Sequence, residues 1–155
     1  MKKYFLFLFI LTITLLFSKT TQISITSDSF EANENKHQTI FNGNVSISKL
    51  SDTINSQKAV VRFDKNNKPI EYKVFKDVSF SISLKDSVLT GSCDELIYVP
   101  KSKVYKLNGH VNIVQSPTNR KIQATKVIID TKINKINIIG QKNKPVKFIF
   151  EVEDK

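Results

Sequence analysis

A regular internal repeat constrains the fold of this chain more than any other feature of its sequence. Val45, Val78 and Val111 recur at one constant interval, each within a segment where apolar and polar residues alternate. A looser fourth copy begins at 138–141 and continues, after an insertion, at 146–148. A second set of apolar positions recurs at nearly constant intervals, at Phe30, Val61, Leu96 and Val127. A unit this small cannot bury its apolar face alone, so about four units must stack and cover one another.

The residues within each unit follow the period of a β-strand. From Val78 to Leu84 one face is apolar and the other carries hydroxyl groups, and 146–152 alternates in the same way with charged outer positions. The segments 59–63 and 126–130 carry apolar residues on both faces, and polar turn clusters separate the runs. The apolar periodicity of a helix is absent after the N-terminal segment. The sequence therefore predicts an all-β fold of short strands joined by tight polar turns.

The N-terminal segment has the pattern of a secretory signal peptide. Two lysines precede a run of uncharged, mostly apolar residues from Tyr4 to Phe17, and Ser18 offers a small residue at a cleavage point. A membrane anchor is the alternative, but a spanning helix needs about twenty apolar residues. We therefore predict a cleaved signal at 1–18, export to the periplasm, and one mature domain at 19–155.

The charge of the chain does not indicate a nucleic-acid partner. Loss of Lys2 and Lys3 with the signal lowers the formal charge from +10 to +8. The remaining basic residues are dispersed lysines, with Arg62 and Arg120 as the two arginines and no basic block. A solvated lysine-rich surface explains this charge, and attraction to an anionic lipid or glycolipid is the functional alternative.

No constellation of residues predicts catalysis, a metal site or a cofactor. His37, His110 and Cys93 share no metal-ligand spacing, and a single cysteine cannot form an internal disulfide. Four glycines are too few and too dispersed for a phosphate-binding loop. We expect Cys93 to be a buried, inert thiol in a strand, and the protein not to be an enzyme.

Two passages resemble the OstA-like repeat of the LptA family. The first is Asn42-Gly43-Asn44-Val45 with the segment 52–61, and the second is Asn108-Gly109-His110-Val111 with 121–127. The opening segment 25–32 is similar to the first strand of the family, so the resemblance extends over about 23–152. Lys76-Asp77 replaces Gly-Asn in the middle copy, which bears on the local turn geometry.

The resemblance implies a fold and a function. The fold is a twisted, V-shaped β-jellyroll, a stack of antiparallel strands whose apolar interior holds the acyl chains of lipopolysaccharide. For each interior residue, ordinary core packing is the alternative to a lipid groove. The groove candidates are Val45, Ile47, Val61, Phe63, Val78, Phe80, Ile82, Leu96, Tyr98, Val111, Ile113, Val127, Ile129, Phe148 and Phe150.

The resemblance also implies assembly through the terminal strands. Strands expected at 23–32 and 146–152 have no further repeat to pair with, so each leaves an open edge that suits a partner strand. The implied partners are further copies in a head-to-tail oligomer, an LptC-like inner-membrane component and an LptD-like outer-membrane translocon. The edge candidates are Ile23, Ile25, Phe30, Val146, Phe148, Phe150 and Val152.

Two other functions are consistent with these sequence features. One is an inner-membrane-anchored, LptC-like component of the same export system. The other is a structural or adhesive β-repeat protein without lipid cargo, whose interior would be filled by its own side chains.

Overall fold

The described chain, residues 21–152 of a computed structural model, forms one open sheet of ten antiparallel strands. The predicted all-β fold is confirmed, and the predicted signal at 1–18 lies outside the described residues. A short 3-10 helix, η1 (Glu34–Lys36), joins the second strand to the third. The strands are β1 (Ile23–Thr26), β2 (Ser29–Asn33), β3 (Gln38–Lys49), β4 (Asp52–Phe63), β5 (Pro69–Ser83), β6 (Val88–Val99), β7 (Val104–Ser116), β8 (Arg120–Asp130), β9 (Lys135–Ile139) and β10 (Lys147–Ile149).

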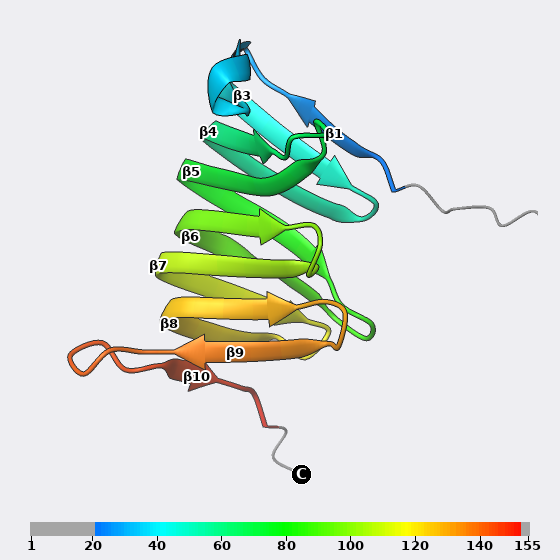
Figure 1. The fold of residues 1–155 in the computed structure, drawn as a ribbon. Helices are drawn as coiled ribbons and strands as arrows, with labels where there is room; N and C mark the ends of the chain where they lie inside the picture. Colours follow the sequence, from blue (N-terminus) through cyan, green and yellow to red (C-terminus); the bar gives the residue numbers. More distant parts are fainter. Residues whose placement is uncertain (1–20, 153–155) are drawn as a thin grey trace, which may run out of the picture.

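The strands stack as rungs, in chain order from β3 to β8 (Figure 1). At each end, two short strands together make one broken rung. β1 pairs with the second half of β3 and β2 with the first half, while β9 and β10 divide β8 in the same way. The described chain is therefore a stack of eight rungs.

The two terminal strands differ from their predicted extents. The segment 23–32 is not one strand, because the chain leaves the ladder at Ser27–Asp28, where the Asp28 N–H donates to the Gly43 carbonyl at 2.9 Å. The strand predicted at 146–152 is shorter, since β10 ends at Ile149. Ile149 pairs with Lys121, the second residue of β8. Almost no residue of β8 therefore remains for a longer β10 to pair with.

Every long strand bends at its middle, and the bends align in one corner. Pairing registers shift there, for example between Asn42 and Val45 and again between Asn108 and Val111. Gly43 and Gly109 have φ angles of +76° and +71°, a conformation that costs other residues about 1–2 kcal/mol. Lys76 and Asp77 adopt the same left-handed conformation, with φ of +67° and +55°. The middle copy thus keeps the bend although it lacks the glycine.

The corner divides the sheet into two arms. The β2 arm comprises 29–33, 38–42, 58–63, 69–75, 95–99, 104–108, 126–130 and 135–139. The β1 arm comprises 23–26, 45–49, 52–56, 78–83, 88–92, 111–116, 120–124 and 147–149. Apolar side chains from alternate positions of both arms meet between them and form a single core. Within residues 21–152, no helix is long and apolar enough to cross a membrane.

Candidate functional site

The predicted groove residues lie mostly in this core. Phe63 is partly buried at its margin, and Phe148 and Phe150 are 45% and 59% exposed near the C-terminal end. The other twelve are buried and face inward, with Val45, Ile47, Val78, Phe80, Ile82, Val111 and Ile113 on the β1 arm and Val61, Leu96, Tyr98, Val127 and Ile129 on the β2 arm.

The sequence prediction missed several buried residues of the same interior. They include Tyr72 and Tyr105, and Val74 and Leu107. The two members of each pair are separated by the same interval as Val45 and Val78. Extending the register of Val45, Val78 and Val111 along the same strands to the β2 arm would therefore have found them. Ile54, Leu89 and Ile122 were also missed. They lie on the β1 arm of β4, β6 and β8, the strands whose β2 arm carries Val61, Leu96 and Val127.

The interior is closed in this structure. At the open side of the V, opposite the corner, a cavity of about 10 Å³ remains between the arms, bordered by Ile23, Ile47, Ile54 and Tyr72 among others. That volume is close to the lower limit for one water molecule. The apolar side chains therefore pack as a core, and a lipid chain needs the arms to separate before it can lie between them.

Four polar or aromatic side chains hold the free ends of the arms together, and we call them the mouth clasp: Lys49, Asp52, Tyr98 and Tyr105. The Tyr105 hydroxyl donates to Asp52 Oδ2 at 2.6 Å, and Lys49 Nζ lies 4.7 Å from the centroid of the Tyr98 ring. The Tyr98 and Tyr105 rings stack with centroids 4.4 Å apart. Lys49 and Asp52 flank the β3–β4 turn on one arm, and the tyrosines flank the β6–β7 turn on the other.

The hydroxyl group of Tyr105 is held neutral. Burial raises its pKa, and the hydrogen bond to Asp52 raises it further because the ionised carboxylate opposes a phenolate. Asp52 also accepts from the Ser83 N–H at 2.9 Å, which fixes the carboxylate against its own arm. The contact between Tyr105 and Asp52 is therefore a short, charge-assisted hydrogen bond that joins the start of β7 to the start of β4.

Contacts across the mouth join strands that are three rungs apart. Tyr105 belongs to β7 and Asp52 to β4. The same offset joins the β8–β9 and β5–β6 turns, where the Lys85 N–H donates to Asn134 Oδ1 at 3.2 Å. The two arms are thus displaced along the stack, and each leaves part of its inner face uncovered at one end.

Each uncovered inner face carries a phenylalanine pair. At the N-terminal end, Phe30 is 69% exposed and its ring centroid lies 6.1 Å from that of Phe41. At the C-terminal end, the rings of Phe148 and Phe150 are also 6.1 Å apart. We call these regions the N-terminal end (β1, β2, Phe30 and Phe41) and the C-terminal end (β9, β10, Phe148 and Phe150).

The predicted edge residues divide between the two ends. Ile23 and Ile25 pair with β3 and pack against the core, whereas Phe30 is exposed. Val146 and Val152 are 38% and 70% exposed. Among residues 21–152, β1 and β2 pair with β3 alone and β9 and β10 with β8 alone, so both ends present strand edges without a partner.

Cys93 is a buried thiol, as predicted. Burial, followed by the nearby negative charge of Asp94, raises the pKa of Cys93 to about 12, so the thiol is protonated at neutral pH. His110 Nδ1 lies 2.8 Å from Asp94 Oδ2 on the outer surface. In the part of the chain that the structure describes, no three His, Cys, Asp or Glu side chains gather as metal ligands.

We expect Cys93→Ser to leave function unchanged and to alter the free energy of unfolding by about 1 kcal/mol, the net value of one hydrogen bond. Serine can donate to the Glu95 carbonyl, which lies 3.3 Å from the present sulfur atom. Denaturant unfolding and complementation of a deletion strain measure the two effects. A folded variant that fails to complement would assign the thiol a role in redox chemistry or ligand binding.

Comparison with protein-family models identifies the family of the chain. Residues 24–135, 112 of the 155, match the model described as "LptA/(LptD N-terminal domain) LPS transport protein". The chain belongs to this family. The resemblance to the LptA family is therefore confirmed, and the family is described as one of LPS transport proteins.

A solved structure has the same fold as this LptA-family chain. It is LptH of Pseudomonas aeruginosa, described as the LptA homologous periplasmic component of the conserved lipopolysaccharide transport device. The TM-score is 0.74 at 13% sequence identity, and the match covers 84% of this chain and 96% of that one. The jellyroll fold is thus confirmed. No match is found among curated proteins.

Proposed function

We propose that this LptA-family chain is a periplasmic bridge protein that binds lipopolysaccharide and carries it from the inner to the outer membrane. One observation carries the proposal: a continuous apolar interior lies between two arms whose free ends meet at the mouth clasp. Membership of a family of lipopolysaccharide transport proteins supports the choice of cargo. The predicted cleaved signal at 1–18 supports the location.

The acyl chains lie between the arms once the clasp has opened. Opening breaks the Tyr105–Asp52 hydrogen bond, which contributes about 1.5–3 kcal/mol, and the contact of Lys49 with Tyr98, which contributes about 0.5–2 kcal/mol. Each methylene group buried from water contributes about 0.8 kcal/mol, so about six methylenes offset the loss. A single fatty acyl chain is longer than that, so its burial is enough to offset the loss of these two clasp contacts.

The two ends dock head to tail and extend the interior across the joint. Each end offers an unpaired strand edge and a phenylalanine pair on the inner face with at least one exposed ring, so backbone pairing and apolar contact act together. We propose further copies of the chain, an LptC-like inner-membrane component and an LptD-like outer-membrane translocon as partners.

Photocrosslinking tests the cargo. Phe80 is buried between the arms, whereas the neighbouring Ser79 lies on the outer face of the same strand. A photoreactive phenylalanine analogue at position 80 should capture lipopolysaccharide in cells, and one at position 79 should not. Equal labelling at both positions would contradict a one-sided groove. Absence of lipopolysaccharide from the purified wild-type protein, together with no labelling at position 80, would favour a structural repeat protein.

A further inference from the structure

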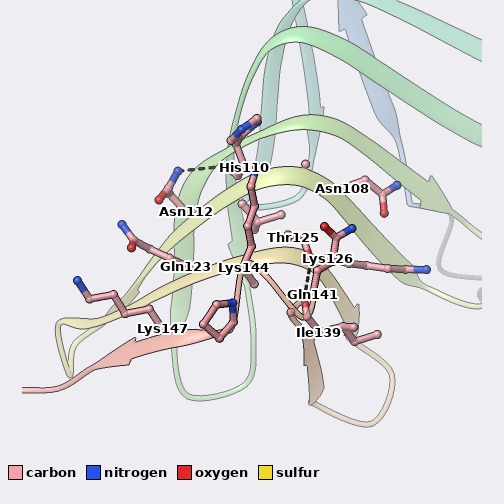
Figure 2. Close-up of a pocket in the computed structure, with 15 residues that line it drawn as sticks. Asn108, His110, Asn112, Gln123, Thr125, Lys126, Ile139, Gln141, Lys144 and Lys147 are labelled. Atoms are coloured by element: carbon pink, nitrogen blue, oxygen red, sulfur yellow. Dashed lines mark hydrogen bonds between the residues drawn. The ribbon is translucent and has the colours of Figure 1, made fainter.

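A cleft lies at the corner of the last rung (Figure 2), and none of its lining residues belongs to the mouth clasp. It has a volume of about 870 Å³ and lies where β9 and β10 separate from each other beside β8. Pairing of β8 with β9 ends at Lys126 and pairing with β10 begins at Gln123, so Ala124 and Thr125 face no strand on this side. The cleft is thus a gap in the ladder.

At two corresponding corners of the stack, an aspartate from the preceding rung closes the space. The Asp28 carboxylate accepts from Asn44 Nδ2 at 3.0 and 3.2 Å and fills the space beside Gly43. Asp94 takes the same place beside Gly109, 2.8 Å from His110 Nδ1. A carboxylate therefore occupies the corner beside each of these two glycines.

The last corner lacks that carboxylate. Thr125 occupies the position in β8 that Asp94 occupies in β6, two rungs earlier. Its hydroxyl group donates to the Ile139 carbonyl at 3.0 Å. The insertion in the fourth repeat, 142–145, folds into a tight turn closed by hydrogen bonds of 2.8 and 2.9 Å between the Gln141 and Lys144 backbones. This turn carries the chain away from the corner and leaves the space open.

The cleft is cationic and rich in hydrogen-bonding groups. Lys126, Lys144 and Lys147 line it, none of its fifteen lining residues is acidic, and none of the three forms an ion pair within residues 21–152. Figure 2 shows Lys126 and Lys147 on opposite sides of the cleft, with their side chains directed away from each other and the Lys144 side chain between them. Neutral donors and acceptors complete the lining, at Asn108, Asn112, Gln123, Thr125 and Gln141.

We propose that this corner cleft binds a phosphorylated sugar. The lysines supply point charges for a phosphate, and the amide and hydroxyl side chains match the donors and acceptors of sugar hydroxyls. The volume suits a small ligand. Val111 and Ala124, which are both buried, belong to the cleft lining and to the core, so the cleft adjoins the apolar interior. Within the proposed function, on which this step rests, the ligand is the phosphorylated headgroup of the cargo.

Titration of the purified full-length mature protein with glucosamine 1-phosphate, followed by amide NMR shifts and calorimetry, tests the proposal. The shifts should centre on Thr125 and Gln141. The variant Lys126→Gln/Lys144→Gln/Lys147→Gln should weaken binding at least tenfold. Lys65→Gln/Lys68→Gln/Lys101→Gln removes the same charge from exposed turns and should weaken it less than twofold. All six lysines are exposed, so both variants should fold.

Inorganic phosphate serves as the second probe. It should bind more weakly than the sugar phosphate, and equal affinity would overturn the proposal by reducing the cleft to a general anion site. Equal loss in both triple variants, or no shifts at Thr125 and Gln141, would also overturn it. Lipopolysaccharide crosslinking at position 80 reports on the proposed function separately, because it does not require the three lysines.

Discussion

Replacing Tyr105 with alanine should lower the free energy of unfolding by about 3–5 kcal/mol, the usual cost of deleting a buried aromatic side chain. Tyr105 is 1% exposed and is among the largest fully buried side chains of the described chain. Its loss removes the stacking contact with Tyr98 and the donor to Asp52. Urea unfolding followed by circular dichroism measures the change.

Tyr105→Phe tests the clasp hydrogen bond separately from the packing of the core. It keeps the ring and removes the hydroxyl group, so it should cost about 1.5–3 kcal/mol, the value of a hydrogen bond to a charged group. It should also speed lipopolysaccharide uptake, because the clasp is weaker while the interior is intact. Uptake as slow as that of the wild type, in a variant with the expected loss of stability, would contradict the role of the clasp.

The pH dependence of unfolding gives an independent check on Tyr105. Its folded pKa is raised, so the unfolded chain loses this proton at about pH 10 while the folded chain keeps it. The stability linked to this group is present below pH 10 and is lost as the pH rises, by about 1.4 kcal/mol per unit. Tyr105→Phe should therefore show a shallower decline above pH 10 than the wild type.

Phe148→Asp at the C-terminal end should abolish self-association while leaving the domain folded. The side chain is 45% exposed and lies on the inner face, opposite Ile122 of β8, where a head-to-tail partner would bury the new charge. Deletion of 146–155 should have the same effect, because it removes the edge strand itself. Analytical ultracentrifugation over a range of concentrations measures association.

A substitution of the next residue, Ile149, provides a matched control. Ile149 is 41% exposed but lies on the outer face of β10, so Ile149→Asp should still associate. Phe30→Asp, at the N-terminal end, should not self-associate when it is measured alone, like Phe148→Asp. Mixed together, these two variants should form dimers and nothing larger, since each supplies one intact end. The end-to-end model fails if the mixture stays monomeric or if the deletion associates like the full-length protein.

The repeat predicted the stack because its period is set by backbone geometry. Two rungs and their turns make up one repeat, and alternation along each rung decides which side chains face inward. Val45, Val78 and Val111 are for this reason all buried at the same place in successive repeats. The left-handed bend at Lys76-Asp77 also follows from the repeat, although its residue types alone disfavour it.

The ends could not be predicted in the same way. Phe30 shares a repeat register with Val61, Leu96 and Val127, yet it is exposed and they are buried. The difference arises from the displacement of the arms by three rungs, which depends on contacts between residues far apart in the sequence, such as Tyr105 with Asp52. The corner cleft was also missed, because a turn-rich insertion at 142–145 does not reveal that it opens a gap in the ladder.

The aligned bends at the corner have a mechanical consequence. Ladder hydrogen bonds run from rung to rung within each arm, so the corner is crossed by the covalent chain of each strand and by short side-chain hydrogen bonds, such as those from Ser56 to the Lys58 carbonyl and from Cys93 to the Glu95 carbonyl. Rotation of one arm relative to the other about the line of aligned bends separates the arms without breaking ladder hydrogen bonds. The width of the interior is then set by one hinge angle and can change without any change in strand pairing.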